Sequence, residues 1–160
     1  MSVAFKKEES AETASETQLP DRPVSSAPNL VTETGLAALQ AQLDAARAAY
    51  ALASEIEDIN ERRRQSAIPV RDLNYFAERL RSAQVVPPPE SSDTVAFGST
   101  VTFSREDGEL RTYRFVGEDE ADPKAGSISY TAPVARALVG KAVGDIVTVG
   151  DQELEITAIA

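Results

Sequence analysis

The sequence predicts an α+β fold in which an antiparallel α-helical coiled-coil hairpin is followed by a small antiparallel-sheet domain. Three observations predict it. Between Val31 and Val86, apolar residues recur at steps of three and four, as on the contact face of two packed helices. Three consecutive prolines at 87–89 then interrupt the chain. After them, apolar and polar residues alternate as they do in strands.

These changes divide the chain into four parts: a tail at 1–31, the hairpin at 32–86, a proline-rich linker at 87–93 and the sheet domain at 94–160. The tail is rich in Glu, Ser, Ala, Thr and Pro and has no apolar period, so we expect it to be mostly disordered. Its few apolar groups near Leu19 could lie extended against the folded part, but a loose tail is the simpler expectation.

The first helix is expected to run from a cap at Thr32 or Thr34 to about Ile56, through a stretch rich in Ala. Apolar residues follow one face of this segment. The expected seam comprises Leu36, Leu39, Leu43, Ala46, Tyr50 and Ala53.

The second helix is expected from about Glu61 to about Gln84, with a seam of Val70, Leu73, Ala77 and Leu80. Pro69 conflicts with a helix interior, where it costs about 3 kcal/mol. The helix could kink there, or it could begin there with Ser66 as its cap. We expect the kink, because it gives two arms of similar length.

The turn between the helices carries the stretch Asp58-Ile59-Asn60-Glu61. Two carboxylates at the exposed tip of a hairpin can act as metal or water ligands. They can equally be part of an ordinary solvated turn, and residue chemistry by itself favours that plainer interpretation.

The sheet domain should begin with a strand at 95–103, followed by a turn at 106–109 and a returning strand at 110–116. An acidic loop at 117–126 leads to a short strand near Ile128. Pro133 suits the first turn of a short helix that Gly140 ends. A final hairpin at 146–159 completes the domain. We interpret the aromatic residues as core: Phe97, Phe103, Tyr113, Phe115 and Tyr130.

The chain contains no Cys and no His. This excludes thiol catalysis, Cys/His zinc sites and Ser-His-Asp triads, and it leaves carboxylates, Lys and Tyr for chemistry. The first residues do not form a signal peptide, and no apolar run approaches the roughly 20 residues that span a bilayer. We therefore expect a cytoplasmic protein without membrane contact.

The net charge of −10 argues against wrapping a DNA duplex as the main task. The charge is unevenly distributed: residues 34–86 carry 7 basic and 7 acidic groups, whereas residues 87–160 carry 6 and 13. The bases of the hairpin cluster at Arg62, Arg63 and Arg64, with Arg71 beyond. An anionic ligand is therefore expected to meet the hairpin.

Several runs of the sheet domain resemble the bacterial Gre transcription elongation factors. The run 113–122, Y-R-F-V-G-E-D-E-A-D, is similar to the family signature Y-x-I-V-G-x-D-E-A-D. The run 128–141 resembles I-S-x-x-S-P-I/L-A-R-A-L-x-G-K, and 95–101 resembles the opening strand of the family. The resemblance covers about residues 31–160.

The resemblance implies a coiled coil followed by an FKBP-like domain. It also implies a monomer that binds bacterial RNA polymerase, enters its secondary channel and meets the nascent RNA 3′ end. Asp58 and Glu61 would then help to hold the Mg²⁺ of the polymerase, which itself cleaves backtracked RNA, so the factor has no cofactor of its own and is not an enzyme. Arg62, Arg63, Arg64 and Arg71 would contact RNA or polymerase. The acidic loop would dock on the polymerase through Glu118, Asp119, Glu120 and Asp122.

The tip departs from the family pattern G-D-L-x-E-N-x-x-Y. Asp58 and Glu61 match it in type and spacing, whereas Glu57, Arg62 and Gln65 replace the Gly, Asn and Tyr. By alignment, each arm of the hairpin is shorter by about seven residues, which would hold the tip back by about 10 Å.

Three functions are therefore compatible with the sequence. The protein could stimulate transcript cleavage through Asp58 and Glu61. It could instead occupy the channel without cleavage, which the short hairpin favours. A prolyl isomerase is the third alternative, but such a site needs an aromatic-lined pocket, and this domain has few aromatic residues and no Trp.

Overall fold

A computed structural model describes residues 19–160 and divides them into two compact units. The hairpin unit contains residues 19–24 and Leu39–Arg81, and the sheet unit contains Ser25–Ala38 and Ser82–Ala160. The prediction of disorder for residues 1–18 lies outside the described residues.

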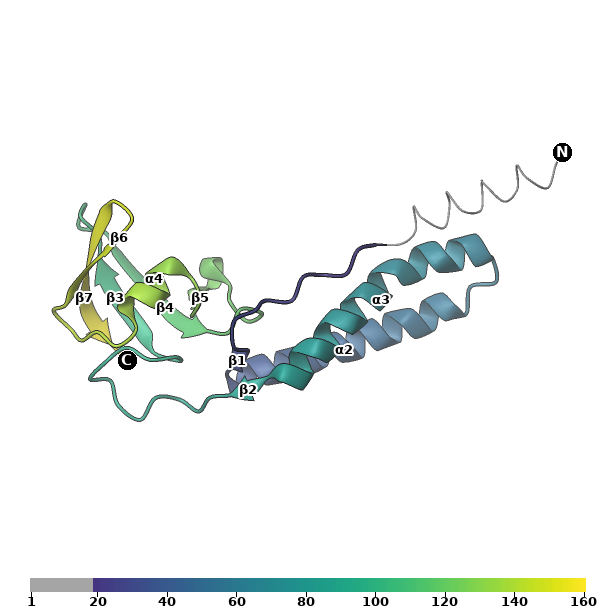
Figure 1. Ribbon diagram of the computed structural model, residues 1–160, viewed down its shortest axis with the longest axis horizontal. Helices are drawn as coiled ribbons and strands as arrows, with labels where there is room; N and C mark the ends of the chain where they lie inside the picture. The colour runs from purple at the N-terminus through teal and green to yellow at the C-terminus, as the bar shows by residue number, and fades with distance from the viewer. Residues whose placement is uncertain (1–18) are drawn as a thin grey trace. The chain divides into compact units, whose positions relative to one another are not determined.

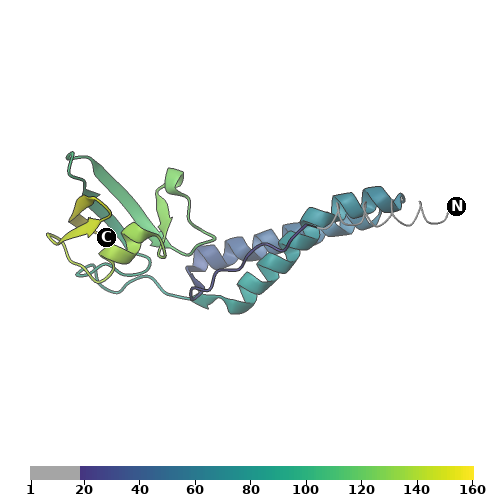
Figure 2. The ribbon, with the colours of Figure 1, turned by 45° about the horizontal axis from the view of Figure 1, so that its top comes forward.

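The two long helices, α2 (Glu33–Ser54) and α3 (Ile59–Ser82), lie antiparallel and side by side, as the two views in Figures 1 and 2 show. Both helices were expected. α3 continues through Pro69, so the alternative in which the helix begins at that proline is wrong. Pro69 has no backbone N–H, so one helical hydrogen bond is missing there, while helical turns continue on both sides of it.

The buried seam of the hairpin unit is shorter than the sequence pattern predicted. Leu39, Leu43, Ala46 and Ala53 are buried on α2. Tyr50 and Val70, which were expected in the same seam, remain 44% and 40% exposed. The seam is therefore interrupted at Tyr50, between the buried Ala46 and Ala53.

Residues 19–24 form an extended segment, here named the strap, that is held against α3 (Figure 1). The Arg22 guanidinium donates a hydrogen bond of 3.2 Å to Asp72 and lies 3.9 Å from the centre of the Tyr75 ring. A cation over an aromatic face is attracted by the ring quadrupole. The strap thus differs from the loose tail that composition predicted.

A two-stranded parallel sheet, which the sequence did not predict, joins β1 (Leu30–Val31) to β2 (Gln84–Val85). Asn29 and Val31 are buried there. The residues that precede α2 are therefore part of the sheet unit.

The five-stranded sheet has the order β5-β4-β3-β7-β6. Its strands are β3 (Thr100–Ser104), β4 (Leu110–Val116), β5 (Ser127–Ser129), β6 (Ile146–Val149) and β7 (Gln152–Ile159). All pairs are antiparallel except β4 with β5, which is parallel. The predicted antiparallel sheet is thus wrong at one edge. The loop at 117–126, which includes the 3₁₀ turn η1 (Pro123–Ala125), is long enough to return the chain in the same direction.

The core of the sheet unit lies between this sheet and the short helix α4 (Pro133–Leu138). Its buried members are Val95, Val101, Phe103, Phe115, Ala135, Leu138, Leu154 and Ile156. Val95 is buried but precedes β3, so the expected strand at 95–103 is confirmed only from residue 100. Gly98 interrupts it with a φ of 89°, a conformation that residues with a Cβ rarely adopt.

We predict that Phe115→Ala destabilises the protein by about 3–5 kcal/mol, because it leaves a cavity in the core. Phe115 is 0% exposed, whereas Leu110 on the same strand is 59% exposed. Leu110→Ala is therefore the matched control and should change stability by about 0.5 kcal/mol or less. Denaturant unfolding measures both, and equal losses would contradict the assigned core.

Candidate functional site

The tip of the hairpin is organised by Asp58, which caps the N-terminus of α3. Its Oδ1 accepts a hydrogen bond of 2.8 Å from the backbone N–H of Glu61, and its carbonyl accepts the N–H of Arg62 at 2.9 Å. The first N–H groups of a helix have no partner within the helix, and an Asp at this position satisfies one of them. The three-residue spacing of Asp58 and Glu61 is therefore the spacing of a helix cap.

Glu61 lies on the first turn of α3 and is held by its own helix. Its two carboxylate oxygens accept hydrogen bonds from Gln65 Nε2 and from the Arg64 guanidinium, each at 2.8 Å. These contacts favour the charged form: the hydrogen bond from Gln65, followed by the charge of Arg64, lowers the pKa of Glu61 below its usual value of 4.5. The tip therefore carries an ionised carboxylate at neutral pH.

The two tip carboxylates are not part of a larger cluster of metal-ligating side chains among the described residues. Within residues 19–160, no group of three or more His, Cys, Asp or Glu side chains could hold a metal ion. Mg²⁺ commonly takes one or two protein carboxylates and completes its shell with water and substrate phosphates. Asp58 and Glu61 could supply such a pair where other ligands come from elsewhere.

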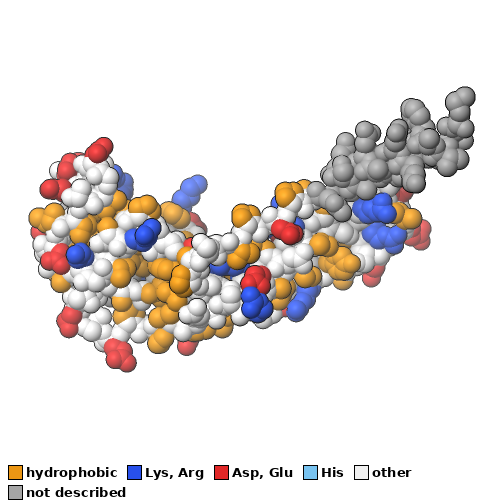
Figure 3. Space-filling view, in the orientation of Figure 1, with side chains coloured by type: hydrophobic (Ala, Val, Ile, Leu, Met, Phe, Trp, Pro, Cys, Tyr) orange, Lys and Arg blue, Asp and Glu red, His pale blue; other side chains and the backbone are white. Residues whose placement is uncertain are grey.

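Three arginines of the predicted basic cluster line one cavity of about 550 Å³ in the hairpin unit. They are Arg62, Arg63 and Arg71, whereas Arg64 is paired with Glu61. The chemistry of the cavity also includes Tyr50 of α2 and Asp21 of the strap. Figure 3 shows basic side chains gathered near the tip end of α3. Sequence reasoning found the arginines but missed Tyr50 and Asp21, because no local sequence pattern indicates that these two residues lie close to the arginines.

The acidic loop of the sheet unit contains both half-buried and exposed acids. Glu118 accepts a hydrogen bond of 2.9 Å from Ser25, and the Thr32 hydroxyl donates one to Glu120. Asp119 and Asp122 are exposed. Of the four residues expected to form a docking surface, these last two are the most accessible to a partner.

Glu120 has a structural role that the sequence did not indicate. Thr32 caps α2 by accepting the N–H of Gly35 at 2.9 Å, and the same hydroxyl donates to the Glu120 carboxylate. A carboxylate beside a helix N-terminus also interacts favourably with the helix dipole. A Cβ at Gly35 would lie 2.6 Å from Glu120 Oε1, so a larger residue there would displace this carboxylate.

The sequence comparisons agree with this arrangement of a hairpin and a sheet unit. A family model described as the C-terminal part of the transcription elongation factors GreA/GreB matches residues 90–160. Transcription elongation factor GreA of Thioalkalivibrio sulfidiphilus is 40% identical over 126 residues, which cover 70% of this chain and 79% of that protein. The chain belongs to the GreA/GreB family. GreA of Sphingopyxis alaskensis is 40% identical over 111 residues, covering 66% and 68%.

Two solved structures are similar to this GreA/GreB family member. Gfh1 of Thermus thermophilus is 22% identical with a TM-score of 0.39, covering 84% of this chain and 99% of that one. The GreA/GreB factor from Nitrosomonas europaea is 27% identical with a TM-score of 0.39, covering 82% and 98%. Both TM-scores are below one half, so membership of the family is based on the sequence comparisons.

No helix within residues 19–160 is both long and apolar enough to cross a membrane.

We predict that Asp58→Ala destabilises the start of α3 by about 0.5–2 kcal/mol, because the cap is lost, while Asp58→Asn costs far less. Asn accepts the same hydrogen bond but carries no charge. Hydrogen exchange at the Glu61 and Arg62 amides measures the effect, and equal protection in the two variants would contradict the capping role.

We further predict that Glu61 titrates below 4.5, so the stability it contributes is present above the pKa of the unfolded chain and lost as pH falls through the lower folded value. The NMR shift of its side-chain carboxyl carbon measures the pKa. In the Gln65→Ala, Arg64→Ala double variant the pKa should rise, and an unchanged value would show that the two contacts do not hold the carboxylate.

Proposed function

We propose that this protein is a transcription elongation factor that binds bacterial RNA polymerase, enters the secondary channel with its hairpin and stimulates cleavage of backtracked RNA. The observation that carries the proposal is the position of Asp58 and Glu61 on the first turn of α3, at the hairpin tip, directly before three arginines. Its relatives are named transcription elongation factors, which supports the same process.

The capping geometry is compatible with a role for Asp58 in cleavage. Asp58 uses Oδ1 for the cap, and within residues 19–160 its Oδ2 accepts no hydrogen bond, so that oxygen is available. In the polymerase, Mg²⁺ would polarise the scissile phosphate and lower the pKa of an attacking water. Asp58 would orient this water or complete the ligand shell while still holding the helix start in place.

Glu61 needs a change of partners before it can act. Its oxygens are held by Arg64 and Gln65, and the contacts are exposed, so they are worth little to stability. RNA phosphates can compete for Arg64, because guanidinium groups bind phosphate in a bidentate fashion. Arrival of the nascent RNA 3′ end would thus release Glu61 at the place where its charge is needed.

The remaining predicted site residues would bind without taking part in the reaction. Arg62, Arg63 and Arg71 would attract RNA, and the exposed Asp119 and Asp122 would contact the polymerase. The tethered Glu118 and Glu120 would position that loop. The factor would act as a cytoplasmic monomer that uses the active site of the polymerase and brings no cofactor of its own.

We predict that Asp58→Asn and Glu61→Gln each reduce RNA cleavage by more than about a hundredfold, because each removes a charged ligand or water-orienting group from the transition state. The assay adds purified protein to a stalled, backtracked elongation complex with Mg²⁺ and reads RNA length on a gel. Glu57→Gln is the matched control, because Glu57 is an exposed acid of the same turn.

Binding to the polymerase should survive the Asp58→Ala, Glu61→Ala double change, since docking is assigned to the sheet unit. Co-purification that is lost in this variant would place the affinity at the tip. Full cleavage by the Asp58→Asn or Glu61→Gln variants would exclude the catalytic assignment.

A specific observation favours a second function, in which the protein occupies the channel without cleavage. Compared with the family pattern, each arm of the hairpin is shorter by about seven residues, which would hold the tip about 10 Å back. The ligand oxygens of Mg²⁺ lie about 2.0–2.1 Å from the ion, so a tip held about 10 Å back could not bind it. Wild-type protein that competes with a GreA factor yet leaves RNA uncut would decide for this function, and one added heptad per arm should then confer cleavage.

A further inference from the structure

The cavity of the hairpin unit exists because the seam between α2 and α3 is not filled. Tyr50 and Val70 occupy positions expected to pack in the seam, yet both line the cavity and remain exposed. Small side chains surround them, namely Ser54, Ser66 and Ala67. A packed interior normally has few voids larger than a water molecule, so about 550 Å³ is a large opening in so small a unit.

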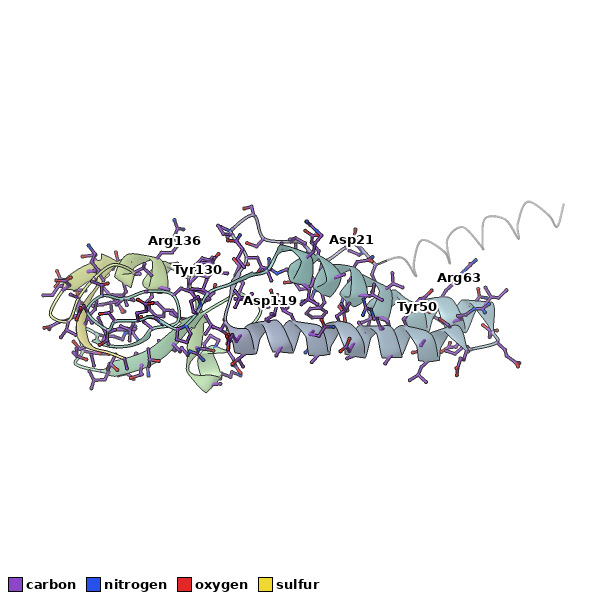
Figure 4. All side chains as sticks on the ribbon, turned by 90° about the horizontal axis from the view of Figure 1, so that it is seen from below. Asp21, Tyr50, Arg63, Asp119, Tyr130 and Arg136 are labelled. Carbon is purple, nitrogen blue, oxygen red and sulfur yellow. The ribbon has the colours of Figure 1, made fainter. Side chains whose placement is uncertain are left out.

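The strap supplies the third wall of this cavity. Leu19 and Asp21 line it together with the two helices, and the next residue, Arg22, is fixed by Asp72 and Tyr75. Figure 4 labels Asp21, Tyr50 and Arg63, which come from the strap, α2 and α3 and lie along the same stretch of the hairpin. The cavity is thus enclosed on three sides by separate segments.

Two of the three arginines that line the cavity, Arg62 and Arg63, lack partners of opposite charge. Within residues 19–160, Arg62 and Arg63 form no ion pair and no side-chain hydrogen bond. Nε of Arg71 is buried without a hydrogen-bond acceptor, and its nearest carboxylate, Asp72, is 3.6 Å away. A buried donor without an acceptor is unfavourable, and a ligand that supplies the acceptor would remove this penalty. Three guanidinium groups therefore face a space in which Asp21 is the sole acidic lining residue among those described.

We propose that this cavity binds a free ribonucleoside polyphosphate. Guanidinium groups recognise phosphate oxygens through paired hydrogen bonds, and an exposed aromatic ring offers a stacking surface for a base. Ser66 adds a hydroxyl for a ribose or a phosphate oxygen. The volume lies within the roughly 300–1,000 Å³ of small-molecule sites. The phosphates bind at Arg62, Arg63 and Arg71, and the base lies against Tyr50.

A nucleotide accounts for the whole lining better than a simple anion does. A phosphate ion would use the arginines but leave Tyr50, Leu19 and Val70 without contact. The negative charge of Asp21 repels that of a polyphosphate, so the strap lowers the affinity for the ligand while it also encloses the ligand. This gives the site a residue whose neutralisation should tighten binding, which is the opposite of what loss of an arginine does.

The proposal does not depend on the polymerase and is tested on the full-length protein alone. Isothermal titration calorimetry at constant ionic strength measures binding of ATP, tripolyphosphate and adenosine. We expect ATP to bind more tightly than either fragment, because it alone satisfies both the arginines and Tyr50. Failure of RNA cleavage in a polymerase assay would leave this result unaffected.

Variants distinguish the arginines that bind the phosphates from Tyr50, which contacts the base. Arg63→Gln and Arg62→Gln should each weaken ATP binding by about tenfold. Tyr50→Leu should weaken ATP but not tripolyphosphate, and Asp21→Asn should tighten both. The matched control is Arg47→Gln, since Arg47 is an exposed arginine of α2 outside the cavity and should leave binding unchanged. Far-UV circular dichroism verifies that each variant keeps its helices.

Three results would overturn the proposal. The first is no measurable heat with ATP in the wild type. The second is equal weakening by Arg63→Gln and Arg47→Gln, which would mean diffuse attraction to a basic surface. The third is a single-stranded RNA oligonucleotide that binds through Arg63 while ATP does not, which would assign the cavity to an RNA strand.

Discussion

The packing of α2 along α3 is the contact on which the hairpin unit depends. Helices in proteins gain most of their stability from tertiary packing, and α3 also carries Pro69 and a run of three arginines that repel one another. The buried side chains of α2, among them Leu39 and Leu43, provide the apolar surface that offsets these costs. At Tyr50, between the buried Ala46 and Ala53, this surface is interrupted, and the arginine-lined cavity lies there.

The tip shows how one residue can serve the fold and remain available for function. A helix start requires an acceptor for its free N–H groups, and Asp58 meets that need with a single oxygen. The negative charge is also favourable at the positive end of the helix dipole. Because a backbone N–H holds one of its oxygens, the Asp58 carboxylate is preorganised, with its orientation set before any partner binds.

In the sheet unit, the residues before α2 are fixed by several weak contacts. Tyr130 donates a hydrogen bond to the carbonyl of Pro28, Thr32 binds Glu120, and β1 pairs with β2. Any side chain at Gly117 would collide with the carbonyl of Leu30, so this position requires the absence of a Cβ. The signature run 113–122 thus combines residues that hold the chain together with exposed acids that a partner can reach.

The sequence by itself determined the two helices, the turn at Asp58, most strands of the sheet and the family, because periodicity and local signature runs carry that information. Local chemistry also predicted the short helix at Pro133 and a cap at Thr32 or Thr34, of which the structure has Thr32. The reverse direction of β5, the β1–β2 pair and the contact of Glu120 with Thr32 were not, because they join residues distant in the chain. Only the tertiary structure showed that Tyr50, which was expected in the seam, lines a cavity together with the arginines and the strap. A helical pattern tells which face of the helix a residue lies on, but it does not tell whether the opposite helix fills the space next to that residue.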